Sequence, residues 1–97
     1  MNREEHLHTC AAEEAAEVAQ AITKSNRFGP KEVYPETGEN NMDRVIREFN
    51  DLVAVMEMLQ SEGALPPGSF YRPNLIEAKK LKVERMILYS RVRGRVS

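Results

Sequence analysis

Residues 13–23 read EEAAEVAQAIT, and this run decides the class of fold. Ala, Glu and Gln are strong helix formers, and the run holds neither Gly nor Pro. With its neighbours it predicts a helix from about Glu4 to Arg27. The helix should stop at Gly29-Pro30, because glycine commonly ends a helix and proline cannot continue one.

The next segment is a loop followed by a second helix. Residues 29–41 (GPKEVYPETGENN) contain two prolines and two glycines, which is typical of a loop. A helix should follow from about Met42 to Ser61, with Asn40 or Asn41 as its N-terminal cap. Phe28, at the end of the first helix, could either stack on a ligand or plug the core, and we favour the plug.

A third helix should begin near Asn74, because Asn74-Leu75-Ile76-Glu77 has the form of a capping box, and should run to about Arg91–Arg93. The pattern contains no convincing strand. We therefore expect an all-α fold, a helical bundle of about three main helices in one domain, residues 1–97. A lone three-helix chain with such long loops is marginal, so homo-oligomerisation should complete the bundle.

Composition and hydropathy bear on the cellular location of the protein. Cys10 is the one cysteine, so no internal disulfide can form. No apolar run approaches the roughly 18 residues of a membrane span, and residues 1–6 (MNREEH) do not resemble a signal peptide. We expect a cytoplasmic protein with no membrane partner.

The net charge of −1 hides an asymmetry. Residues 1–76 carry 13 acidic and 7 basic residues, whereas residues 77–97 carry 2 acidic and 7 basic ones. One interpretation is an acidic part that holds a cation and a basic part that holds phosphate. The other is a solvated basic segment with weak affinity for nucleic acid.

Two pairs of carboxylates accompany the apolar stripes of the first two helices. The first stripe consists of Leu7, Cys10, Ala11, Val18, Ala21 and Ile22, and the second of Val45, Phe49, Leu52, Val53, Met56 and Leu59. Glu14 falls in the middle of its stripe and Glu17 about 60° to one side. A buried carboxylate without a partner costs several kcal/mol, in order of magnitude, so Glu14 should be protonated, paired or metal-bound. Glu48 and Asp51 follow one border of the second stripe. Arg44 should lie on the same flank as Glu48 and Asp51. The other polar residues of that helix, Arg47, Asn50 and Glu57, should point elsewhere.

If the two stripes pack together, the four carboxylates converge and repel one another unless a cation neutralises them. All-oxygen ligation suits a hard ion, Mg²⁺ or alternatively Mn²⁺. On the third helix, Lys79 lies in the middle of an apolar face with Lys82 about 60° away. Lys79 is either a lysine whose stem covers the core or one that points at a phosphate or at the carboxylates.

The motifs Glu13-Glu14-Ala15-Ala16-Glu17 and Glu48-Phe49-Asn50-Asp51, in this order, resemble the MazG-like superfamily of all-α nucleoside triphosphate pyrophosphohydrolases. The resemblance covers roughly residues 10–94. Thirty residues separate Glu17 from Glu48, slightly more than the spacer usual in that family, and the excess falls in the loop 29–41.

The resemblance implies hydrolysis between the α and β phosphates of a (d)NTP, giving a (d)NMP and pyrophosphate. It also implies Mg²⁺ held by Glu14, Glu17, Glu48 and Asp51, and a homodimer or homotetramer. On this hypothesis Glu14 or Glu17 also positions or deprotonates the attacking water. Phosphate oxygens would be bound by three basic residues, Lys79, Lys82 and, more weakly, Arg44.

The alternative is a non-catalytic helical binding module whose basic C-terminal segment engages nucleic acid or a protein partner. We favour the enzyme, which has a nucleotide rather than a nucleic acid as its partner. Neither the preferred base nor the number of metal ions follows from the sequence.

Overall fold

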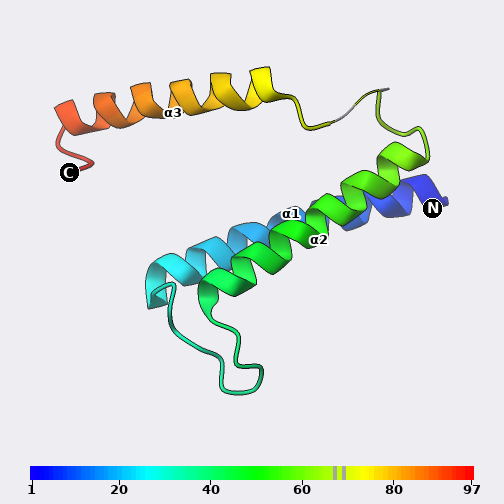
Figure 1. Cartoon of the computed structure of the whole chain (residues 1–97), viewed down its shortest axis with the longest axis horizontal. Helices are drawn as coiled ribbons and strands as arrows, with labels where there is room; N and C mark the ends of the chain where they lie inside the picture. Colours follow the sequence, from blue (N-terminus) through cyan, green and yellow to red (C-terminus); the bar gives the residue numbers. More distant parts are fainter. Residues whose placement is uncertain (67, 69) are drawn as a thin grey trace. The chain divides into compact units, whose positions relative to one another are not determined.

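The computed structural model describes residues 1–66, 68 and 70–97. The chain is all-α, with α1 at Arg3–Phe28, α2 at Asn41–Ser61 and α3 at Pro73–Val92 (Figure 1). The expected class and the three helices are confirmed. Within the described residues, β-type pairing is limited to one isolated bridge, between Val33 and Asn40.

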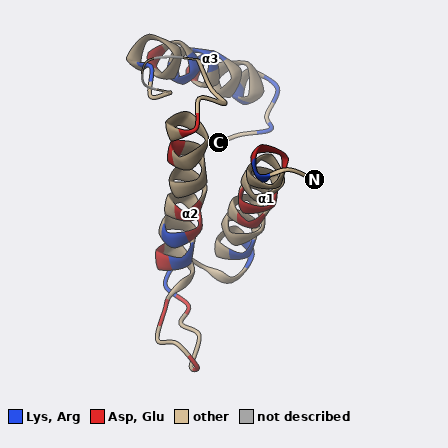
Figure 2. Cartoon of the chain, turned by 90° about the vertical axis from the view of Figure 1, so that its right-hand side faces the viewer, with Lys and Arg blue, Asp and Glu red and all other residues tan. Residues whose placement is uncertain are grey.

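The chain divides into two compact units, Met1–Pro67 and Gly68–Ser97. The first unit is an antiparallel helical hairpin: α1 and α2 lie side by side, joined by the loop 29–40 (Figures 1 and 2). An ion pair between Arg3 and Glu62 ties the open ends of the two helices together. The second unit contains α3. Whether residues 1–97 act as one domain stays a prediction.

Local capping explains most of the helix ends. Asn40 is the N-cap of α2, and its Oδ1 accepts a hydrogen bond from the backbone N–H of Asp43 at 2.7 Å. Gly29 ends α1 with a positive φ of 97°, which glycine adopts without strain. The capping box at Asn74 was wrong, because α3 begins one residue earlier at Pro73 and has no side-chain cap. Proline suits the first helical position, since its missing N–H has no partner there anyway.

The hairpin has a thin core. Its fully buried apolar residues are Leu7, Ala21 and Leu59, and most other members of the two stripes are half-buried. Phe28 was expected to plug this core, but its exposed fraction is 53%, so that interpretation was wrong. It lies at the last position of α1 and lines the cavity at the loop end of the hairpin. Other large apolar side chains of the hairpin are also exposed: Ile22, Met42, Ile46, Phe49 and Met58.

The helix α3 is described along its whole length, and none of its residues is buried. It carries apolar side chains on more than one side, and all but Ile87 of the large ones are exposed: Leu75, Ile76, Leu81, Val83, Met86, Leu88, Tyr89 and Val92. None of the helices, judged over the described residues, is long and apolar enough to cross a membrane.

Candidate metal centre

Three of the four predicted carboxylate ligands meet between the two helices of the hairpin. Glu14 and Glu17 come from α1 and Glu48 from α2, and each offers an oxygen within 4.8 Å of the others. The spacing of three residues puts Glu14 and Glu17 on neighbouring turns of one helix face. Packing of α1 on α2 brings Glu48 to that face. The antiparallel hairpin therefore makes one acidic cluster from motifs 30 residues apart.

The cluster is partly withdrawn from water. Glu48 is only 4% exposed and Glu14 is half-buried. Within the part of the chain that the structure describes, Oε2 of Glu48 and Oε2 of Glu14 are buried and have no hydrogen-bond partner. Unsatisfied buried polar atoms are costly, so these two oxygens call for a proton or a cation.

The pKa of the Glu48 carboxyl lies above its ordinary value in the metal-free protein. Burial is the main cause, because it disfavours the charged form, and the neighbouring Glu17 carboxyl adds to it both by sharing a proton and by its negative charge. Arg47 acts in the opposite direction. The free protein thus holds a proton more readily at this place than an ordinary glutamate does.

Asp51 lies at the edge of the cluster. It is one turn beyond Glu48 on α2, and its side chain is 48% exposed. It does not belong to the group of three whose oxygens lie within 4.8 Å of one another. A bridge through Arg47 connects it to Glu48, because Arg47 Nη1 lies 3.1 Å from Glu48 Oε1 and 3.8 Å from Asp51 Oδ2. Its role as a ligand stays a prediction.

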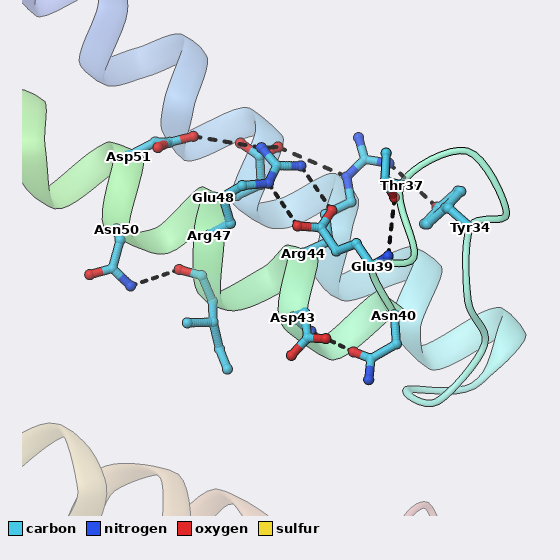
Figure 3. A network of polar contacts seen from close by, with 11 residues as sticks. Tyr34, Thr37, Glu39, Asn40, Asp43, Arg44, Arg47, Glu48, Asn50 and Asp51 are labelled. Carbon is cyan, nitrogen blue, oxygen red and sulfur yellow. Dashed lines mark hydrogen bonds and ion pairs between the residues drawn. The ribbon is translucent and has the colours of Figure 1, made fainter.

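The prediction that Arg47 points elsewhere was wrong. Its guanidinium lies between Glu48, Asp51 and Glu39, as Figure 3 shows. Toward Glu39 it makes a two-pronged contact, with Nε 2.9 Å from Oε2 and Nη2 3.1 Å from Oε1. The sequence did contain a signal for this, since Arg47 and Asp51 have the i, i+4 spacing of a helical ion pair.

Glu39 reaches Arg47 from the loop 29–40, and the sequence analysis did not find it. The loop folds back on itself: Tyr34 N donates to Glu39 O at 2.9 Å, and Gly38 N donates to Tyr34 O at 2.8 Å. Gly38 has a φ of 72°, which closes this turn. The fold-back directs Glu39 toward α2, and the hydrogen bond from Arg47 holds the pKa of Glu39 below its ordinary value.

Arg44 lies on the expected flank of the cluster. Its Nε is 3.9 Å from Glu48 Oε1, and its Nη1 donates to the hydroxyl of Tyr34 at 3.4 Å. The Nε atom is buried and lacks a hydrogen-bond partner among the described residues. The guanidinium also lies 5.7 Å from the centre of the Tyr34 ring. In Figure 2, basic residues accompany acidic ones at the loop end of α2.

Lys79 and Lys82 lie on α3, in the second unit, and both are exposed. The side chains that flank Lys79 on this helix are exposed too, including Leu75 (58%) and Val83 (40%). Lys79 therefore does not cover a core within its own unit. The part that both lysines play toward phosphate stays a prediction.

A cavity of about 330 Å³ opens at the loop end of the hairpin. It is lined by Lys24, Phe28, Glu32, Val33, Tyr34 and Asn41. Lys24 on α1 follows Glu17 by seven residues, and a helix rises 1.5 Å per residue, so the cavity lies on the order of 10 Å from the acidic cluster along α1. Apolar and aromatic walls with a few polar groups are typical of a ligand site.

The donor set fits a hard divalent cation. The cluster offers carboxylate oxygens only, of which two are buried and unsatisfied, and no histidine or cysteine belongs to it. No protein-family model, curated protein or solved structure matches the chain. The functional interpretation therefore depends on the site itself and on the motif resemblance.

Proposed function

We propose that the protein is a Mg²⁺-dependent nucleoside triphosphate pyrophosphohydrolase acting in the cytoplasm, with Mn²⁺ as the alternative cation. The observation that carries the proposal is the acidic cluster, in which Glu14, Glu17 and Glu48 converge with two buried, unsatisfied oxygens. Carboxylates that converge in this way repel one another unless a proton or a cation offsets their charge. Asp51, one turn from Glu48, would complete the ligand set.

The proposed reaction adds water to the α-phosphorus and breaks the anhydride bond between the α and β phosphates, so that pyrophosphate leaves. The cation, when bound, supplies charge neutralisation for the phosphates and lowers the pKa of a water bound to it. One carboxylate of the Glu14/Glu17 pair positions or deprotonates the attacking water. Glu17 suits this role because it is exposed at the rim of the cluster.

Basic groups near the site would bind the phosphate oxygens. Arg44 is well placed, because it borders the cluster and its Nε is left without a hydrogen-bond partner among the described residues. Lys79 and Lys82 are proposed for the same task. The nucleoside would extend into the cavity beside Phe28 and Tyr34, about 10 Å away.

We further propose that copies of this chain assemble into a homodimer or homotetramer. In the hairpin, Ile46 and Phe49 are 55% and 48% exposed, and Leu88 of α3 is 62% exposed. The hairpin is acidic and the C-terminal segment is basic, so the two surfaces are also complementary in charge. Assembly would bury both apolar surfaces.

The proposal is tested by screening all (d)NTPs for pyrophosphate release with and without Mg²⁺. Glu48→Gln and Asp51→Asn should each reduce the activity by about 10² or more, because each removes a charge from the ligand set and leaves the helices intact. Glu13→Gln, an exposed neighbour outside the cluster, is the matched control and should retain activity. Circular dichroism checks that helicity is unchanged.

Full activity in both Glu48→Gln and Asp51→Asn would refute the metal-site proposal.

A second candidate function is favoured by α3, which is basic and has no buried residue: a non-catalytic module that engages nucleic acid or a protein partner. Such a protein would release no pyrophosphate from any nucleotide, and would retard DNA in a salt-sensitive way if nucleic acid is its partner.

A further inference from the structure

Arg47 occupies the side of the proposed metal centre that faces the loop 29–40. Arg47 Nη1 contacts Glu48 Oε1 at 3.1 Å and Asp51 Oδ2 at 3.8 Å. Both oxygens belong to residues that would bind the cation. An arginine keeps its proton at any physiological pH, so Arg47 cannot make way by losing its charge. A cation that binds these oxygens therefore competes with a permanent positive charge.

The guanidinium divides its contacts between two edges. Nε and Nη2 form the two-pronged contact with Glu39, at 2.9 and 3.1 Å, while Nη1 serves Glu48 and Asp51 (Figure 3). Two parallel hydrogen bonds to a carboxylate are stronger and better oriented than a single one. Rotation away from α2 would break the Nη1 contacts and leave the Glu39 contact in place. The Arg47 side chain is 50% exposed and so has room to move.

We propose that Arg47 is a built-in counter-ion which a divalent cation must displace from Glu48 and Asp51, and which Glu39 retains after displacement. This inference rests on the proposed metal centre. It assigns Arg47 and Glu39 as positioning residues that set the cation affinity.

The first test measures the affinity for Mg²⁺ alone by isothermal titration calorimetry, with no nucleotide present. Arg47→Gln should bind Mg²⁺ about tenfold more tightly than wild type, because a unit charge a few ångströms from a divalent ion opposes its binding by about this factor even when water screens it. Arg27→Gln makes the same change in net charge next to Phe28, away from the carboxylates, and should leave the affinity unchanged.

The second test separates retention by Glu39 from a simple charge effect. Glu39→Gln should weaken Mg²⁺ binding severalfold in the wild-type background, because Arg47 loses its alternative partner and stays on Glu48 and Asp51. In the Arg47→Gln background the same change should have a clearly smaller effect, limited to the loss of one more distant negative charge. The Nε–H resonance of Arg47 should also shift during the Mg²⁺ titration, with the midpoint found by calorimetry.

Three outcomes would overturn the inference. Equal or weaker binding by Arg47→Gln, when wild type binds Mg²⁺, contradicts the displacement and leaves the metal centre standing. Equal tightening by Arg27→Gln shows that net charge alone is responsible. If neither wild type nor Arg47→Gln binds Mg²⁺, the metal centre itself is wrong, and the inference fails with it.

Discussion

The two units of the chain differ in which residues they bury. The hairpin buries few residues, yet half of its buried residues are polar: Ser25, Asn41 and Glu48 alongside Leu7, Ala21 and Leu59. The α3 unit buries none of its helix and exposes apolar side chains on more than one side. Asn41 is satisfied by its hydrogen bond to Gly29 O, whereas Glu48 has a buried oxygen without a hydrogen-bond partner among the described residues, which costs stability. On α3, Leu81 and Leu88 are 66% and 62% exposed.

Because of this difference in burial, the roles of the acidic cluster and of the basic helix α3 must be tested by different experiments. The cluster is complete within one unit, so its geometry follows from the packing of α1 on α2. The contribution of Lys79 and Lys82 depends on what α3 packs against. Experiments that compare the units therefore test the site and the assembly separately.

The largest expected contrast is between two leucine truncations. Leu59→Ala should lower the free energy of unfolding by about 2–5 kcal/mol, because Leu59 is 2% exposed and its removal leaves a cavity in a thin core. This loss should not depend on protein concentration. Leu81→Ala removes a side chain that is 66% exposed within its chain, so its effect should appear only where copies associate. Urea unfolding at several concentrations, with sedimentation analysis, measures both.

A concentration-independent loss for Leu81→Ala as large as that for Leu59→Ala would show that α3 completes the core of its own chain. The contrast between the units would then disappear. The oligomeric state would no longer be needed to explain the exposed faces.

The next contrast uses pH and lies within the hairpin. Because the pKa of Glu48 is raised in the folded, metal-free protein, the folded state binds a proton more readily than the unfolded one. The stabilisation from this proton is fully present below the ordinary value of 4.5 and is lost as the pH rises through the folded pKa. Wild type should therefore lose stability relative to Glu48→Gln as the pH rises.

Guanidinium unfolding of the metal-free proteins from pH 4 to pH 8 measures this difference, with Glu13→Gln as the control for an exposed carboxylate. If the proposed metal centre is correct, Mg²⁺ at pH 8 should restore stability to wild type and not to Glu48→Gln, because a ligand of the native state raises stability. A difference in stability that does not vary with pH would mean that the surroundings of Glu48 do not raise its pKa.

Much of the hairpin and its site could be predicted from the sequence because both depend on local rules. Helical periodicity placed Glu14 on the buried side of α1 and Glu48 beside the stripe of α2, and the structure brings their carboxylates together. Arg47 was missed because periodicity gives the direction of a Cα–Cβ bond, whereas a long side chain reaches partners well off that direction. Glu39 was missed because its approach depends on the fold-back of the loop, which is a non-local feature.

The exposed positions of Phe28 and Phe49 could not be predicted for a related reason. A stripe states which residues share a helix face, but it does not state how much of each side chain the partner helix covers. Phe28 and Phe49 are 53% and 48% exposed although the two helices pack together.

The smallest expected contrast compares two asparagines at helix starts. Asn40→Ala should destabilise the hairpin by about 1 kcal/mol, because the Asn40 side chain accepts the hydrogen bond from Asp43 N that caps α2. Asn74→Ala should change stability by only a few tenths of a kcal/mol, since Pro73 starts α3 and no side chain caps it. Thermal unfolding followed by circular dichroism resolves a difference of this size. An equal loss at both positions would mean that Asn74 caps α3 in solution, and that α3 starts where its sequence pattern predicted.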